Sequence, residues 1–79
     1  MKLNEALSKR LIELLEEKEM TAYGLFMKSG VSQSTISDIK NMNNDAVNAR
    51  ILFELCEGLG ISLKDFFDSP LFEGGVIAD

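Results

Sequence analysis

The segment GVSQSTISDIKNM, residues 30–42, combines an apolar pair with a run of small polar residues. Ile36 and Ile39 stand three positions apart, so both would lie on one side of a helix. The other side would carry amide, hydroxyl and carboxylate groups, on Gln33, Ser34, Ser37 and Asp38. Such groups recognise a partner by donating and accepting hydrogen bonds. The pattern predicts either a helix with a solvated face or a helix that lies against a partner.

Catalytic chemistry is not indicated anywhere in the chain. The sequence has no histidine and one cysteine, Cys56, which excludes an internal disulfide and zinc sites built from Cys and His pairs. It also lacks a glycine-rich phosphate loop and a carboxylate pair in a predicted cleft. We therefore expect no enzyme activity, no cofactor, no metal and no small-molecule ligand.

Length and composition predict one all-helical domain. The chain has 79 residues, of which 46% are hydrophobic and 27% charged, as in globular proteins. The residues that follow Met1 contain scattered charges and no signal-like apolar run, and no stretch reaches the roughly 20 apolar residues of a membrane span. A cytoplasmic protein without membrane contact is the expectation.

Apolar residues recur at helical spacing along most of the chain. They predict helices over about 4–18, 22–28, 33–41 and 48–59, with a fifth starting after residue 62. Side chains suited to cap these helices precede them: Asn4, Thr21, Ser32 and the pair Ser62 and Asp65. Gly30 is expected in the left-handed region, where it would end the second helix.

The predicted core gathers the apolar residues that share the inner faces of these helices. They are Leu7, Leu11, Leu14, Leu15, Leu25, Phe26, Val31, Ile36, Ile39, Leu52, Leu55, Cys56, Leu59, Phe66 and Phe67. The tail LFEGGVIAD, which follows Pro70, has two apolar pairs around a Gly-Gly break and no clear period.

The net charge of −5 is distributed unevenly. Residues 20–50 carry three basic and two acidic side chains, whereas residues 51–79 carry one basic and six acidic ones. The middle of the chain is therefore compatible with nucleic acid, although its positive charge is small.

Two stretches, LIELLEEKEMTAYGLFMKSGVSQSTISDIKN and LFELCEGLGISLKDFF, resemble the Cro/CI-type helix-turn-helix domain of phage repressors and small bacterial regulators. The resemblance covers roughly residues 7–67. It implies an all-α, five-helix, lambda-repressor-like DNA-binding domain over residues 1–68. It leaves residues 69–79 as a tail that is either a dimer contact, folded back on the core, or disordered.

The resemblance also implies which side chains contact DNA. Gln33, Ser34 and Asp38 match the base-reading positions; glutamine suits adenine N6 and N7, and aspartate accepts from cytosine N4. The remaining candidates for contact with the DNA backbone or phosphates are Thr21, Tyr23, Lys28, Ser32, Thr35, Ser37, Lys40, Asn41, Asn43 and Asn44. Tyr23 is a candidate because its hydroxyl could replace the glutamine that the family usually has at position 22. For each of them the alternative is a solvated surface residue, and Ser32 is a helix cap in either case.

The sequence departs from the family pattern at three places. Ala22 replaces the usual glutamine, and Leu15 and Lys40 replace an arginine–glutamate pair. The loop over residues 41–48 has no lysine or arginine, so a single copy should bind weakly and a homodimer should bind better. The residues available for a dimer surface are Ile51, Phe53, Leu71, Phe72, Val76 and Ile77.

The sequence therefore predicts a sequence-specific DNA-binding transcription regulator, a repressor that acts as a homodimer. Its helix over residues 33–41 would enter the major groove of double-stranded DNA. The alternative is an antitoxin-like module that uses the same fold to bind a regulatory protein partner, with little or no DNA binding. The acidic C-terminal third and Ala22 favour this alternative.

Overall fold

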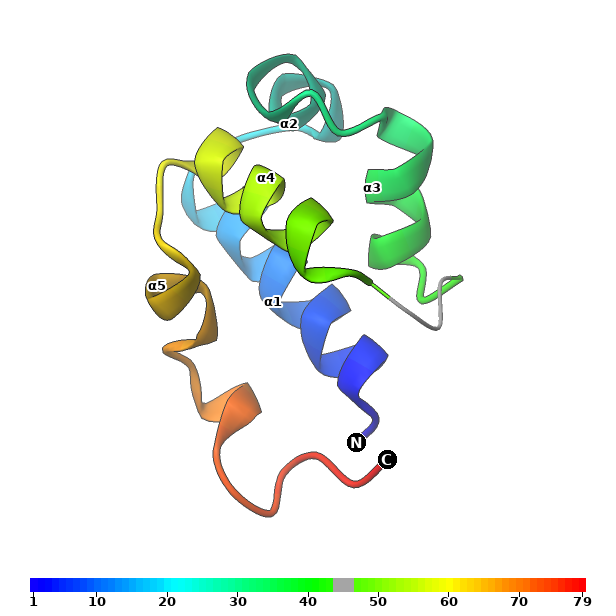
Figure 1. Ribbon diagram of the computed structural model, residues 1–79, viewed down its shortest axis with the longest axis vertical. Helices are drawn as coiled ribbons and strands as arrows, with labels where there is room; N and C mark the ends of the chain where they lie inside the picture. Colours follow the sequence, from blue (N-terminus) through cyan, green and yellow to red (C-terminus); the bar gives the residue numbers. More distant parts are fainter. Residues whose placement is uncertain (44–46) are drawn as a thin grey trace.

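The computed structural model describes residues 1–43 and 47–79 as an all-helical fold (Figure 1). Its elements are α1 (Leu3–Glu17), α2 (Ala22–Ser29), α3 (Gln33–Lys40), α4 (Ala49–Leu59), α5 (Leu63–Phe67) and the 3₁₀ turn η1 (Pro70–Phe72). Within the described part of the chain, no helix is both long enough and apolar enough to cross a membrane.

Side-chain caps start four of the five helices. Thr21, Ser32, Asn48 and Ser62 each accept the backbone N–H three residues further on. Ser62 and Asp65 complete the predicted capping box, since Asp65 also accepts from the Ser62 N–H. These bonds satisfy N–H groups that a helix leaves without partners in its first turn.

The predicted Asn4 cap of α1 is wrong. The helix begins at Leu3, and Lys2 stands at the N-cap position without a side-chain cap bond. The Leu3 N–H donates to Asp79 Oδ1 at 2.9 Å instead. A carboxylate from the far end of the chain thus does the capping, which local sequence could not indicate.

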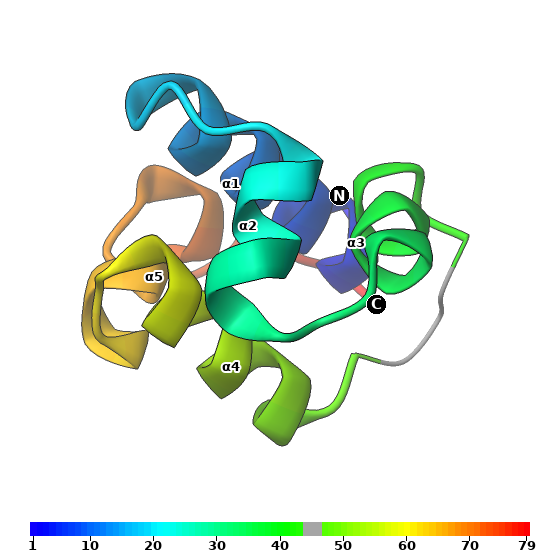
Figure 2. The ribbon, with the colours of Figure 1, turned by 90° about the horizontal axis from the view of Figure 1, so that it is seen from above.

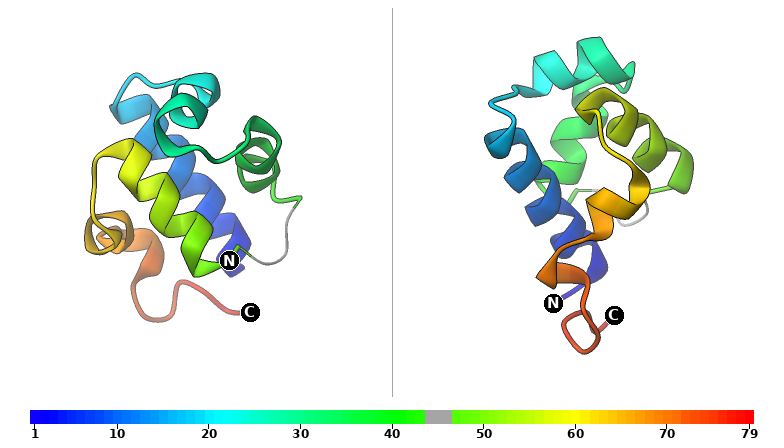
Figure 3. Two further views of the ribbon diagram at one scale, coloured as in Figure 1. Left: turned by 45° about the horizontal axis from the view of Figure 1, so that its top comes forward. Right: turned by 90° about the vertical axis from the view of Figure 1, so that its left-hand side faces the viewer.

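The helices enclose one core. The most extensive contacts join α2 to α4 and α1 to α3. Seen from above, α2 lies between α1 and α4 with α3 to one side (Figure 2). Figure 3 shows α2 at one end of the molecule and η1 with the tail at the other. The buried cluster contains Leu7, Leu11, Leu14, Leu15, Leu25, Val31, Ile36, Ile39, Leu55, Cys56, Leu59 and Phe66.

The packing of α4 against α2 depends on Gly58. A Cβ at this position would lie 2.6 Å from Cβ of Ser29 and 3.0 Å from Cδ1 of Leu25. The two helices therefore approach closely where a larger residue would not fit.

Arg10 holds α5 onto α1. Its side chain is buried, and Nε donates to the Phe66 carbonyl at 2.6 Å while Nη2 donates to the Asp65 carbonyl at 2.8 Å. Nη1 pairs with Glu13 one turn along α1. The arginine thus satisfies carbonyls at the end of a five-residue helix that is too short to be stable alone.

The prediction that Phe66 and Phe67 both close the core is half wrong. Phe66 is buried to 1% exposure, whereas Phe67 is 41% exposed. Phe67 packs edge-on against Phe72 of η1, with ring centroids 4.9 Å apart. Adjacent residues point about 100° apart on a helix, and here Phe66 points toward the core while Phe67 points toward η1.

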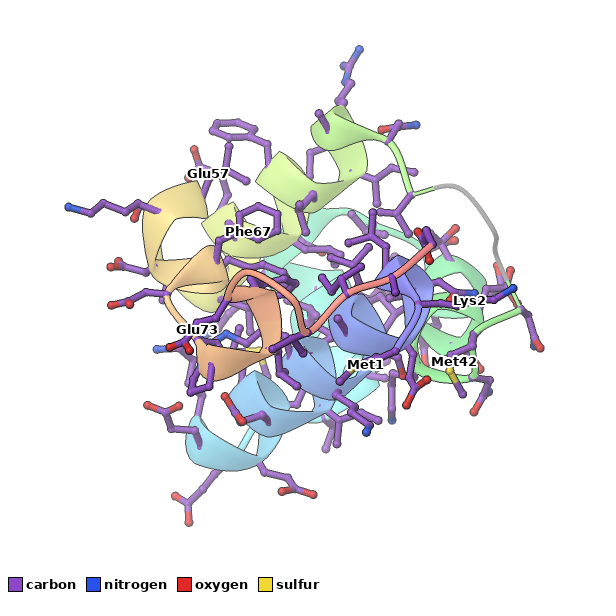
Figure 4. All side chains as sticks on the ribbon, turned by 90° about the horizontal axis from the view of Figure 1, so that it is seen from below. Met1, Lys2, Met42, Glu57, Phe67 and Glu73 are labelled. Carbon is purple, nitrogen blue, oxygen red and sulfur yellow. The ribbon has the colours of Figure 1, made fainter. Side chains whose placement is uncertain are left out.

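The tail folds back along the start of α1. The Ala78 N–H donates to the Met1 carbonyl at 2.8 Å, and the Met1 amino group donates to the Val76 carbonyl at 3.3 Å. Figure 4, seen from below, shows Met1 where the tail crosses the first turn of α1. The two chain ends therefore meet at the N-terminal end of α1, away from α2 (Figure 1).

Candidate nucleic-acid interface

A tight turn places α3 across α2. Gly30 ends α2 in the left-handed conformation, with φ of 77°, as predicted. Its N–H donates to the Phe26 carbonyl at 2.9 Å, and the Val31 N–H donates to Oγ of Ser29 at 3.1 Å. Val31 is 6% exposed and inserts into the core, so the chain leaves the turn in a fixed direction.

The two faces of α3 differ sharply in burial. Ile36 is fully buried and Ile39 is 5% exposed. The opposite face is open to solvent at Ser32, Gln33, Ser34 and Ser37, and half-buried at Thr35, Asp38 and Lys40. The amphipathic pattern of residues 33–40 is therefore confirmed, and the isoleucines attach a polar face to the domain.

Hydroxyl groups at the start of α3 form a connected cluster. Oγ of Ser32 accepts the Thr35 N–H at 3.2 Å and donates to Oγ1 of Thr35 at 2.9 Å. The Ser32 and Ser34 hydroxyl oxygens lie 3.2 Å apart. The cluster fixes the first turn of the helix while leaving lone pairs and rotatable hydroxyl protons on the outside.

Gln33 and Asp38 retain their full hydrogen-bonding capacity. Neither side chain bonds to another group within residues 1–43 and 47–79. Ser34 and Asp38 are four residues apart on one helix face. The rise between them is about 6 Å, or roughly two base-pair steps of DNA. Ser34 and Asp38 therefore present a hydroxyl and a carboxylate on one side of α3, and Gln33 adds an exposed amide in its first turn.

The far end of α3 is tied to α1. Oγ of Ser8, a buried residue, donates to the Lys40 carbonyl at 2.6 Å. Asn41 continues the chain and donates from Nδ2 to Oγ of Ser37 at 3.1 Å. The chain then turns at Met42, whose φ is 58°, and the Asn43 N–H donates to the Asp38 carbonyl at 2.8 Å.

Two of the predicted phosphate-contacting residues are lysines near this face. Lys28 is exposed in the last turn of α2, and Lys40 is half-buried at the end of α3. No carboxylate pairs with either lysine within the described ranges. Lys40 also borders a surface hollow of about 440 Å³ with Leu15, Glu16 and Glu19.

The other predicted contacts lie around the start of α2 and the end of α3. Oγ1 of Thr21 accepts the Gly24 N–H at 3.0 Å, so this hydroxyl already caps α2. Tyr23 is 57% exposed and leaves its ring on the surface beside Phe26. Asn41 and Asn43 are exposed, and Asn44 lies outside the described residues.

Sequence reasoning missed Ser8, which ties the end of α3 to α1, and Arg10, which holds α5 onto α1. Ser8 stands three residues before Leu11, and Arg10 stands four residues before Leu14. Helical spacing therefore places both on the apolar stripe of α1. A polar residue on such a stripe is the signal that could have identified them.

Cys56 belongs to the core and not to this face. It is 1% exposed, as the sequence predicted for a small buried residue. Burial raises the pKa of its thiol, with smaller contributions from the nearby Asp65 and Glu57 carboxylates. The thiol therefore stays protonated, which is opposite to the requirement for a reactive cysteine.

Comparison with known proteins gives independent evidence. A profile of the Cro/C1-type HTH DNA-binding domain matches residues 10–70. The wild-type restriction-modification controller protein C.Esp1396I is 29% identical, with a TM-score of 0.76 over 84% of each chain. The prophage Lp1 protein 11 is 30% identical, with a TM-score of 0.79 over 92% of this chain and 97% of that one. No curated protein sequence matches significantly.

These comparisons confirm the five-helix helix-turn-helix fold and the binding class. The matched residues include the turn at Gly30 and the polar face of α3. They assign DNA binding rather than catalysis to the domain. By its sequence profile and its fold, this chain belongs to the Cro/C1-type helix-turn-helix family of DNA-binding domains.

Proposed function

We propose that this protein is a sequence-specific transcription regulator that represses by occupying a two-fold operator as a homodimer. The observation that supports this most is the outer face of α3. Gln33 and Ser34 are exposed there and Asp38 is half-buried, while Ile36 and Ile39 fix the helix to the core. Exposed groups of this kind at the start of a recognition helix can meet base edges in the major groove.

Three residues divide the proposed base reading. Gln33 is suited to a bidentate hydrogen bond with adenine N6 and N7, and the Ser34 hydroxyl can form hydrogen bonds with the edges of several different bases. Asp38 accepts the N4 protons of cytosine and repels carbonyl oxygens and phosphates. Its carboxylate therefore sets the strictest requirement on the sequence and on the docking angle.

The remaining contacts fix the orientation of α3 on the duplex. We assign phosphate or sugar contacts to Lys28, Lys40, Thr21, Tyr23, Ser32, Thr35, Ser37, Asn41, Asn43 and Asn44. Only two of these side chains are positively charged. The electrostatic part of the binding free energy is therefore small for one copy, and two copies on half-sites about 34 Å apart supply more contacts.

The solved neighbours support a regulatory role. One is a restriction-modification controller protein and the other a prophage protein.

Selection of bound duplexes from a random library, followed by titration at about 50 and 200 mM salt, tests the proposal. We expect a two-fold symmetric consensus and an affinity that falls steeply with salt, since phosphate contacts release counterions. A transcription assay on the protein's own promoter region should show repression. Absence of any sequence-selective complex at either salt would overturn the proposal in favour of the antitoxin-like protein-binding function.

A further inference from the structure

One solvent-facing surface of the domain is not used by the proposed reading of DNA. The outer face of α4 consists of Arg50, Phe53, Glu54 and Glu57, which recur at helical spacing. Phe53 is 50% exposed, and the Arg50 side chain is 87% exposed. This face therefore presents an apolar ring with charged residues on both sides of it.

Most of the other residues predicted for a dimer surface are packed within the monomer. Ile51 is half-buried against the core, and Phe72 packs on Phe66 and Phe67. Leu71, Val76 and Ile77 are half-buried in the folded-back tail. Of the predicted set, Phe53 is left with the greatest exposure.

The charges on this face are ordered so that the face complements itself. Arg50 and Glu57 stand at equal distances from the midpoint between Phe53 and Glu54. If two copies of α4 pack antiparallel across a two-fold axis at that midpoint, Arg50 of each copy faces Glu57 of the other. Phe53 then lies against Phe53 of the second copy at the axis, where burial of both rings is favourable.

The Arg50 guanidinium is largely open to such a contact. Its Nε lies 3.8 Å from Oε2 of Glu54 on the same helix, which is a weak, open ion pair. In the antiparallel arrangement the guanidinium would bridge Glu54 of its own copy and Glu57 of the second. Bridging also offsets the repulsion between the two Glu54 carboxylates near the axis.

We propose that the outer face of α4 pairs with the same face of a second copy, and this rests on the proposed two-fold operator. Figure 1 shows α4 at the front of the molecule with α3 beside it, and the view from above in Figure 2 places α4 at the lower edge with α3 to its right. A two-fold axis within the interface and perpendicular to α4 points to the side where α3 lies. Both α3 helices of such a pair therefore face the same side, as one duplex requires.

The pair is small and therefore weak. α4 has 11 residues, so the contact is about 16 Å long and one helix wide. This is less than the roughly 800 Å² per partner of a standard stable interface. We expect a dissociation constant between about 10 µM and 1 mM in solution, with DNA holding the two copies together.

Symmetric cross-linking tests the geometry directly. Glu54→Cys places the new thiols next to the axis, about 1.5 Å apart along the helix direction, whereas Arg50→Cys separates them by about 10 Å. A disulfide needs Cα atoms closer than about 7 Å.

Under mild oxidation at about 0.5 mM protein, well within the proposed association range, E54C should form at least tenfold more covalent dimer than R50C. The unmodified chain, whose Cys56 is buried, is the blank. Equal dimer from both variants, or none from E54C, would overturn the pairing.

Charge exchange tests the chemistry by sedimentation equilibrium without DNA. Arg50→Glu and Glu57→Arg should each raise the dimer dissociation constant at least tenfold, because each places like charges opposite one another. The double variant R50E/E57R restores opposite charges and should return within threefold of the original value. Single variants that dimerise normally, or a double variant as weak as the singles, would overturn the proposal.

These outcomes are separate from the proposed function. If E54C cross-links but no sequence-selective DNA complex forms, the α4 pairing stands and the regulator proposal fails. If a two-fold operator is bound while E54C gives no covalent dimer, the regulator stands and the α4 pairing is wrong.

Discussion

Two regions of this domain carry polar side chains in opposite ways. At the junction of α1 and α5, the buried Arg10 donates to two backbone carbonyls and pairs with Glu13. On the outer face of α3, Gln33 is exposed and makes no side-chain bond to any described residue. The first region is satisfied internally, whereas the second keeps its hydrogen-bonding groups available.

This difference distinguishes polar groups that stabilise the fold from polar groups that are available to bind a ligand. A buried donor without a partner costs about 1–3 kcal/mol, so Arg10 can exist inside only because carbonyls surround it. An exposed amide or hydroxyl exchanges water for a ligand at little cost. Removing groups from the junction should therefore reduce stability, and removing groups from α3 should reduce binding alone.

Phe66→Ala should have the largest effect, because it removes a fully buried ring from the core at the junction. We expect a loss of about 3–5 kcal/mol in the free energy of unfolding, measured by urea denaturation. The matched control is Phe53→Ala, whose ring is 50% exposed. F53A should change the stability of the monomer far less than F66A. Similar losses in both variants would contradict the burial described for these two rings.

Arg10→Met keeps an apolar stem but removes both bonds to the α5 carbonyls. The expected loss is about 2–3 kcal/mol in unfolding free energy, since hydrogen bonds from a charged donor are among the stronger ones. Lys9→Met is the control, because Lys9 makes only an exposed pair with Glu5. A change below about 0.5 kcal/mol in R10M would show that α5 is held by apolar contacts alone.

Replacing Gln33 and Ser34 together with alanine should leave unfolding free energy within about 1 kcal/mol of the original. Affinity for the selected operator should fall roughly 10- to 150-fold, since a good base contact contributes about 1–3 kcal/mol. Fluorescence anisotropy with operator and unrelated duplexes measures this. Affinity for the unrelated duplex should change less than about twofold, because phosphate contacts remain. An unchanged operator affinity would place the reading face elsewhere.

The smallest effect concerns Cys56 and pH. Because its pKa is raised in the folded state, the neutral thiol contributes stability in full below its ordinary pKa. That contribution is lost as pH rises through the raised value. Unfolding free energies measured from pH 7 to 10 should therefore fall more steeply for the original chain than for Cys56→Ala. Parallel curves for the two proteins would contradict the raised pKa.

Much of the fold could be predicted because its signals are local. Thr21, Ser32 and Ser62 start their helices, and Gly30 ends α2, through bonds that span only three or four residues. The spacing of Ile36 and Ile39 correctly predicted which face of α3 is buried. The proposed reading face follows from the same period, because the residues not used by the core must face outward.

Local sequence signals thus predict the helices, the turn between α2 and α3, and the two faces of α3. Which polar groups meet across the chain depends on how the helices pack. Ser8 bonds to the Lys40 carbonyl, and Asp79 caps α1 across 76 positions. Helical period shows which side of a helix a residue occupies but not which element faces it. The partners of Ser8, Arg10 and Asp79 are set by packing, as is the exposure that leaves Phe53 for a second copy.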